Sequence, residues 1–455
     1  MFKAFAVSDT SKLLPVRRFL ASDWFGWILM VLALVALFTN QYVYALVGAI
    51  FVGALVLLLT DDPVSMFMPV LITAAVIIQA KNSFDAIMRF LPVYIFFAVA
   101  VVLHIFLYKA PKGTHMGKLK VPMLLICFTV FLGGLGSIAP AEYFAGVSIG
   151  HMFALGPMLL IFYWELGRKI RPGQNYTDQM DVRLSKMCCM LTLFLFLAVL
   201  EYYLEHFDVF SANPGILPFQ WRNNASTMLM MAMPFTFYMG SKHFKYYFFS
   251  LISALTLVLT GSRAGLLMGG IEFVALLIYF GIADKRHRKL LLGVVAAGVL
   301  VLLVFLPKLL PFLSYTLGRF TMESGENTIR LEHWKRSVQD FLTNPVFGMG
   351  LGYMGNSDIH HNAEGVLCYY HSSIPQIIGS FGLLGVATYG YQFIARVKLM
   401  TSRTSLFARS VLWSFIGLEL MSLVNPGIFS PLYAFYMVVL LVITENYSFG
   451  VNNEV

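Results

Sequence analysis

Long hydrophobic segments alternate with polar connections along most of this chain. A helix needs roughly 20 apolar residues to span a bilayer, and fourteen segments come close to or reach that length. They are residues 24–39, 43–60, 64–80, 86–108, 121–138, 149–167, 185–204, 224–240, 244–261, 264–282, 288–306, 372–396, 406–424 and 428–444. Because these runs are continuous and lack the alternation of lipid-exposed strands, they predict an all-α polytopic membrane protein with about 12–14 transmembrane helices.

One polar interval, from Pro307 to Tyr370, interrupts this pattern. Between Asn327 and Leu342 its apolar residues recur near helical spacing, which predicts an amphipathic helix that lies on the membrane surface or caps a cavity. The apolar positions are Ile329, Trp334, Val338, Phe341 and Leu342. We expect the helix to stop at Asn344-Pro345. The glycines that follow, Gly348, Gly350 and Gly352, predict a turn whose backbone can approach a ligand or another helix closely.

Composition and charge fit a membrane protein. Of 455 residues 58% are hydrophobic and 12% are charged, whereas soluble proteins have about 25% charged residues. The net charge of +9 could suggest nucleic-acid binding, but the basic residues do not cluster in one domain. Instead, 23 of the 32 Lys and Arg residues lie in the N-terminal segment and in alternate connections. The positive-inside rule therefore predicts cytoplasmic termini and an extracytoplasmic long interval.

These features divide the chain into five predicted parts. They are a cytoplasmic N-terminal segment (1–23), a transmembrane bundle of about 11 spans (24–306), an extracytoplasmic loop (307–370), about 3 C-terminal spans (371–444) and a cytoplasmic tail (445–455). The N-terminal segment lacks the features of a cleaved signal peptide. The four cysteines indicate neither a disulfide framework nor a zinc site.

Several charged residues lie on the predicted outer side of the spans. Arg263 lies in the short turn Thr260-Gly-Ser-Arg-Ala-Gly265, and Arg222 precedes the eighth span. Glu272 lies in the outer half of a span, where it could pair with an arginine. Charges at such depth generally face a protein interior or a wet cavity, although a single interfacial arginine can also snorkel to water.

The order of these motifs resembles the O-antigen ligase and O-antigen polymerase superfamily. The resemblance rests on Arg263 in its turn, on Arg330-Leu-Glu-His-Trp334, on Asn344-Pro-Val-Phe-Gly-Met-Gly-Leu-Gly352, and on His371-Ser-Ser-Ile-Pro-Gln376 with Gly382 and Gly385 behind it. It covers residues 260–385. Outside these residues, the predicted spans resemble those of the family only in being hydrophobic.

The resemblance implies a GT-C-like glycosyltransferase of the bacterial cytoplasmic (inner) membrane that works on the outer side of that membrane. Its donor would be an undecaprenyl-diphosphate-linked glycan, and its acceptor a glycan or glycolipid. Family members use no nucleotide sugar and no essential catalytic metal. Membrane lipid and other polysaccharide-assembly proteins are the further partners that it implies, and nucleic acid is not among them.

The chemistry of this transfer accounts for the residue types. When a glycosyl diphosphate bond breaks, negative charge develops on the leaving group, and fixed cations stabilise it. Arginine binds phosphate oxygens bidentately and stays charged, so we assign Arg263 and Arg330 to the diphosphate, with Arg222 as a third candidate. Histidine titrates near neutral pH, and His371 is the candidate base or orienting group for the acceptor hydroxyl. Attack opposite the diphosphate would invert the anomeric centre.

Several alternatives remain open from the sequence. His360 and His361 compete with His371, although their His-Asn-Ala-Glu context also fits a loop cap. A lipid-linked oligosaccharide flippase is the main rival function, because many spans and intramembrane charges suit transport. A peptidoglycan polymerase of the shape, elongation, division and sporulation family is a second rival. The sequence does not separate polymerase from ligase.

Overall fold

The computed structural model describes residues 10–62, 64–80, 89–108, 117–137, 146–170, 179–208, 222–321, 325–353 and 367–446. Within these ranges the chain forms helices joined by turns and has no strand. The predicted all-α class is therefore confirmed.

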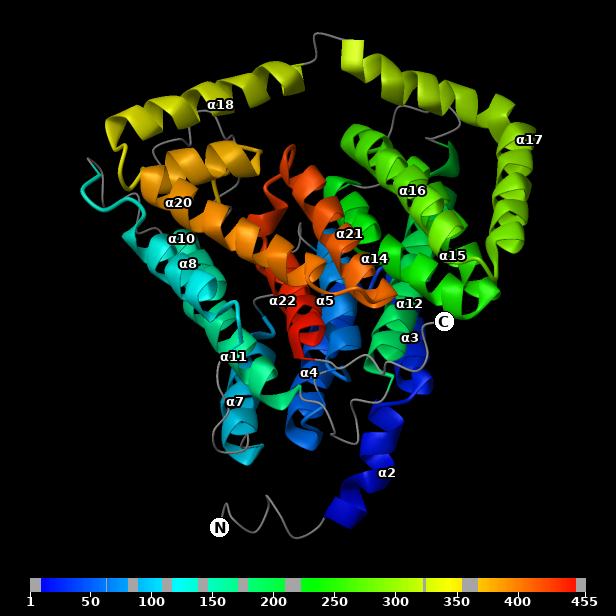
Figure 1. Cartoon of the computed structure of the whole chain (residues 1–455), viewed down its shortest axis with the longest axis horizontal. Coiled ribbons are helices and arrows are strands. Elements are labelled where there is room, and N and C mark those ends of the chain that lie inside the picture. Colours follow the sequence, from blue (N-terminus) through cyan, green and yellow to red (C-terminus); the bar gives the residue numbers. More distant parts are fainter. Residues whose placement is uncertain are drawn as a thin grey trace. The chain divides into compact units, whose positions relative to one another are not determined.

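The helices belong to two compact units, which are described separately (Figure 1). Unit 1 comprises Met1–Thr114 and Arg168–Leu317, and unit 2 comprises His115–Gly167 and Gly318–Val455. Unit 1 contains α2 (Thr10–Leu20), α3 (Asp23–Phe38), α4 (Tyr42–Leu59), α5 (Phe67–Ala80), α7 (Leu91–Leu107), α12 (Met180–Glu205), α14 (Arg222–Lys242), η3 (Phe244–Tyr246), α15 (Tyr247–Leu259), α16 (Arg263–Ala283) and most of α17 (Arg288–Thr321). Unit 2 contains α8 (Lys120–Leu132), α10 (Gly146–Phe153), η2 (Ala154–Met158), most of α11 (Leu159–Lys169), α18 (Gly325–Thr343), α20 (Ser373–Thr401), α21 (Leu406–Ser422), η5 (Gly427–Phe429) and α22 (Pro431–Asn446).

Each of the fourteen predicted hydrophobic segments contains a helix, but fewer helices meet a spanning criterion. Among the described residues, six are long and apolar enough to cross a membrane: Tyr42–Leu59, Ser148–Lys169, Met180–Glu205, Arg263–Ala283, Arg288–Pro307 and Ser373–Thr401. The pair Leu13–Leu20 and Asp23–Phe38, bent by 66°, would make a seventh. Other apolar helices are too short to meet the criterion. The 13 residues of α8, for example, extend only about 20 Å, whereas the hydrocarbon core of a bilayer is about 30 Å thick. The chain is a polytopic membrane protein with about six or seven candidate spans among its described residues.

Helix α14 forms the centre of unit 1. Every residue from Ala225 to Gly240 is buried, and the helix packs against α5, α12, α15 and α16. A helix that is apolar around its whole circumference is stable only when neighbours cover it on all sides. The packing around α14 therefore holds the start of α14 and the neighbouring α16 in fixed positions within the unit.

The polar interval that the sequence predicted is largely helical where it is described. Helix α17 continues through Pro307 and Pro311 to Thr321, beyond the predicted end of its span. Helix α18 then covers the predicted amphipathic segment and ends at Thr343, immediately before Asn344-Pro345. The sequence thus located α18 correctly, and it missed the extension of α17.

Helix α20 is broken at Gly382, and the glycine turn after α18 fits into this break. Gly382 has φ 57° and ψ −146°, a backbone conformation that is essentially restricted to glycine. The backbone N–H of Leu383 donates to Pro345 O at 2.8 Å, and that of Met349 donates to Gly379 O at 2.8 Å. The predicted close approach is therefore to another helix, and these bonds fasten the segment that follows α18 to both sides of the break.

We expect Gly382→Ala to destabilise the protein. A Cβ at this position would lie 2.4 Å from Pro345 O, and a strained φ/ψ pair alone costs about 1–3 kcal/mol. The midpoint of thermal unfolding in detergent should therefore fall. Gly390→Ala on the same helix is the matched control, because a Cβ there meets nothing within 4 Å. Equal stability of the two variants would contradict the role given to the break.

Candidate functional site

One stripe of polar residues on α18 faces the protein. His333 is only 1% exposed and Asp340 only 6%, Ser337 is buried, and Arg330 is half-buried. Residues three and four positions apart share one face of a helix, so these side chains form a single polar stripe. Helix α18 packs against α20, and Figure 1 shows it beside the first part of that helix. The stripe is therefore the face of α18 that unit 2 covers.

The apolar side chains of α18 lie on the opposite, exposed face. Trp334 is 43% exposed and Leu342 68%. Leu331 and Val338 complete this exposed stripe. In a membrane protein, lipid can solvate an apolar face, whereas buried polar groups need protein partners. The sequence predicted an amphipathic helix, and the structure adds that its polar side faces inward.

The polar stripe reaches His371, the predicted base. The rings of His333 and His371 contact each other edge to face, with their centroids 4.9 Å apart. His371 is half-buried and lies directly before Ser372, the N-cap residue of α20. Arg330 lies one turn before His333 on the same helix. The structure thus brings His371 to the side of α18 that carries Arg330.

The backbone of His371 has a conformation that is uncommon for a residue other than glycine. Its φ is +55°, and such conformations persist where the surroundings hold them in place. Gln376, which is fully buried, accepts a hydrogen bond from Tyr370 N at 2.9 Å through Oε1 and donates to Ser380 Oγ at 2.8 Å through Nε2. The bend that carries His371 is therefore fixed to the first turns of α20.

A side-chain hydrogen bond also joins this bend to α18. The buried hydroxyl of Tyr370 donates to Asp340 Oδ2, and the Tyr370 ring packs so closely on Gly379 that a Cβ there would lie 2.8 Å from it. Charge-assisted hydrogen bonds of this kind are among the stronger side-chain contacts. The polar stripe, the bend at His371 and the start of α20 therefore form one connected site in unit 2.

In unit 1, the turn that carries Arg263 is joined to the start of α14, where Arg222 lies. Ser262 caps α16 by accepting from Gly265 N at 3.0 Å, and its hydroxyl donates to Asn223 Oδ1 at 2.7 Å. Arg263 follows Ser262 as the first residue of α16, and Arg222 precedes Asn223 as the first residue of α14. The structure therefore brings the two chain segments that carry these arginines together.

Small residues permit this contact between α14 and α16. Ser226 and Thr260 are hydrogen-bonded through their hydroxyls at 3.0 Å, and a Cβ at Gly265 would lie 2.2 Å from Ser226 Oγ. Arg222 and Arg263 are both half-buried. A helix N-terminus favours anions, so Arg263 at the start of α16 adds a formal positive charge where the helix already attracts a phosphate.

Residues 248–390 match the family model described as O-Antigen ligase. The chain carries an O-antigen ligase domain. The predicted resemblance and the assignment as an enzyme of this family are thereby confirmed. No curated protein matches the chain. The O-antigen ligase domain extends from α15 into α20 and includes Arg263, Arg330 and His371, whereas Arg222 lies outside it.

Glu272, a further candidate in the O-antigen ligase domain, makes no hydrogen bond to the described residues. It lies on α16, is 1% exposed, and neither carboxyl oxygen has a partner there. The sequence suggested that it pairs with an arginine, but no such pair forms with any described arginine. The carboxyl group is therefore buried in unit 1 without holding either arginine in place.

The two remaining candidate histidines also lie in the O-antigen ligase domain. His360 and His361 fall outside the described residues. Cys368, just before the bend, is buried, and burial raises the pKa of its thiol. A thiol with a raised pKa is mostly protonated near neutral pH and is a poor nucleophile. Cys368 is thus a buried thiol beside the bend that carries His371.

Sequence reasoning did not assign roles to His333, Asp340, Tyr370 or Gln376. A signal for His333 and Asp340 was nevertheless present, because Arg330, His333, Ser337 and Asp340 recur at helical spacing as clearly as the apolar residues do. Tyr370 and Gln376 had no comparable signal. Their hydrogen bonds depend on how the bend at His371 meets α18 and α20.

Proposed function

We propose that this enzyme transfers a glycan from an undecaprenyl-diphosphate donor to a sugar hydroxyl of a glycan or glycolipid acceptor. The reaction belongs to cell-surface polysaccharide assembly, in which O-antigen ligase family enzymes act. The transfer takes place on the extracytoplasmic side of the membrane, with both termini in the cytoplasm. The distribution of Lys and Arg over alternate connections supports this orientation.

One observation carries the proposal most directly. A buried polar stripe on α18 holds Arg330, a phosphate-binding residue type, one turn from His333, and His333 contacts His371. A cation for the leaving group and a group that accepts a proton are therefore supplied from the same part of unit 2. Glycosyl transfer from a diphosphate needs these two functions.

His371, Arg330 and Arg263 have separate roles in the proposed reaction. The acceptor oxygen attacks the anomeric carbon, and the bond from that carbon to the diphosphate oxygen breaks with its electron pair on the oxygen. The imidazole of His371 takes the hydroxyl proton, and Arg330 and Arg263 stabilise the diphosphate. Arg222 is a third candidate cation, because its helix start is joined to the Arg263 turn. Attack from the side opposite the diphosphate inverts the anomeric centre, and this scheme uses no metal.

Turnover in detergent tests the proposal against a flippase. We expect purified protein to consume a polyprenyl-diphosphate glycan when a matched acceptor is present, with release of polyprenyl diphosphate that mass spectrometry can follow. Transport between leaflets cannot occur in a micelle. Failure of all matched donor and acceptor pairs, with folded protein, would favour a transporter.

The glycans of a deletion strain distinguish polymerase from ligase. Loss of chain length with single repeat units still attached to the acceptor identifies a polymerase. Accumulation of lipid-linked polymer identifies a ligase. Both outcomes retain the proposed reaction and differ only in the acceptor.

A further inference from the structure

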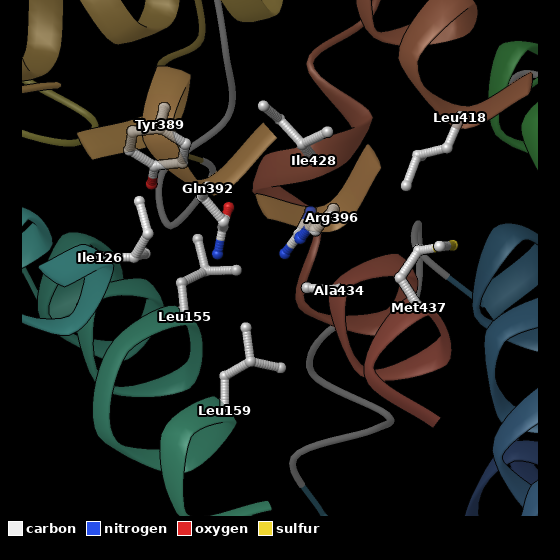
Figure 2. Close-up of a pocket in the computed structure, with 10 residues that line it drawn as sticks. All are labelled: Ile126, Leu155, Leu159, Tyr389, Gln392, Arg396, Leu418, Ile428, Ala434 and Met437. Carbon is white, nitrogen blue, oxygen red and sulfur yellow. The ribbon is translucent and has the colours of Figure 1, made fainter. Parts of the chain in front are cut away.

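A second polar region lies inside unit 2, in a pocket at the other end of α20 from His371. The pocket is lined by α8, η2, α11, α20, α21, η5 and α22. Tyr389, Gln392 and Arg396 supply its polar side chains (Figure 2). Their spacing places all of them on one face of α20. The remaining lining is apolar and includes Ile126, Leu155 and Met437.

Arg396 is buried in this pocket without a full set of hydrogen-bond partners. It is 7% exposed, and its Nε is buried with no acceptor among the described residues. Gln392 beside it donates to Met123 Sδ at 3.5 Å, and a thioether is a weak acceptor. A buried guanidinium is costly unless acceptors satisfy it. Ionisable residues at such depth in membrane proteins commonly mark a binding site.

The charged neighbour of Arg396 does not complete its hydrogen bonding. Glu419 on α21 interacts with Arg396 electrostatically, but the two described side chains form no direct ion pair. Glu419 therefore offsets part of the charge while the planar donor fork of Arg396 remains available on the pocket side. An oxyanion with two or more oxygens matches such a fork.

The position of Arg396 along α20 indicates where such an anion would come from. Beyond the break at Gly382, α20 continues as a helix to Thr401, and these 19 residues extend about 28 Å, close to the hydrocarbon thickness of about 30 Å. Arg396 lies about 8 Å of helix from the end at Thr401, so its long side chain can extend to the depth of lipid headgroups. A phosphate can approach from there, and the apolar walls of the pocket can contact hydrocarbon.

We propose that this pocket binds the phosphate group of a membrane lipid, with Arg396 and Gln392 as donors and the apolar lining around the start of its acyl chains. The site is separate from the proposed catalytic residues, and the proposal does not rest on the proposed function. A bound lipid would connect the helices that line the pocket and would stabilise unit 2.

Lipid-dependent stability of the purified full-length chain tests this site. We expect phosphatidylglycerol to raise the thermal unfolding midpoint of delipidated protein and to remain bound in native mass spectrometry. Diacylglycerol with the same acyl chains should do neither, because it lacks the phosphate. Equal stabilisation by inorganic phosphate at the same concentration would overturn the lipid assignment, as would an equal effect of diacylglycerol.

Variants locate the effect at Arg396. Arg396→Gln should weaken phosphatidylglycerol binding roughly ten- to hundredfold, as expected for the loss of charge-assisted hydrogen bonds, and Arg396→Lys should weaken it less. Lys398→Gln is the matched control, because Lys398 is an exposed cation on the same helix. Unchanged binding in Arg396→Gln would overturn the proposal. If that variant does not fold, the lipid comparison on the unaltered chain still decides.

Glu419→Gln separates lipid binding from a purely structural charge pair. A carboxylate close to the phosphate opposes binding, so its neutralisation should leave phosphatidylglycerol affinity unchanged or increase it. If Arg396 serves only as the counter-charge of Glu419, this variant should instead lose as much stability as Arg396→Gln, with no lipid effect in either. That result would overturn the proposal.

Discussion

Replacement of His371 should lower glycan transfer by about 10²–10⁴-fold, the usual contribution of a general acid or base. The informative substitution is His371→Asn, because asparagine tolerates a positive φ better than most residues, and His371 has φ +55°. His371→Ala would combine loss of the imidazole with backbone strain. Initial rates with a purified lipid-linked donor and its acceptor measure the effect.

The control for this variant is a histidine outside the O-antigen ligase domain. His206, at the end of α12, is partly exposed and stacks on Tyr202. His206→Asn should retain the rate of the unaltered enzyme. If His371→Asn also retains it while the protein remains folded, His371 is not the base, and His360 and His361 become the candidates to test.

Replacement of Arg330 should produce the second largest loss. Removing one fixed donor from a developing negative charge typically lowers kcat by about 10²–10³-fold, and we expect Arg330→Ala to fall in this range. Arg330→Lys should recover part of the activity, because it restores the charge but not the bidentate geometry. The rate of donor consumption at saturating acceptor is the measurement.

Lys335→Ala is the matched control for Arg330, since Lys335 is an exposed cation on the same helix. It should leave the rate unchanged. Full activity of Arg330→Ala would remove Arg330 from the site. Equal losses in both variants would indicate a general electrostatic effect of α18 on the approach of the anionic donor.

Much of the fold could be predicted because hydrophobic length is a strong local signal. Every predicted hydrophobic segment contains a helix, and α18 was located from its periodicity. Among the described residues, fewer helices meet the spanning criterion than the sequence predicted, because an apolar run such as that of α8 can form a helix shorter than the bilayer. Helix α14 lies in a predicted hydrophobic segment but is not among the candidate spans of the described residues, and it forms the protein core of unit 1.

The direction in which α18 faces could not be predicted. Periodicity separates its two sides, but either an apolar or a polar side can be the one that the protein covers. His333 and Asp340 are buried because unit 2 supplies Tyr370 and His371 as contacts. Such contacts join residues far apart in the chain, and no local pattern encodes them. Arg263, Arg330 and His371 were selected by motif and chemistry, which do not depend on those contacts.

The inverted orientation of α18 affects how this region can be studied in isolation. A fragment that contains α18 but ends before Tyr370 would expose the Trp334 and Leu342 side to water and would leave Asp340 without Tyr370. Its stable arrangement in water would bury the apolar side by self-association. Antibodies or ligands selected on such a soluble fragment would therefore recognise the side chains that the intact enzyme covers.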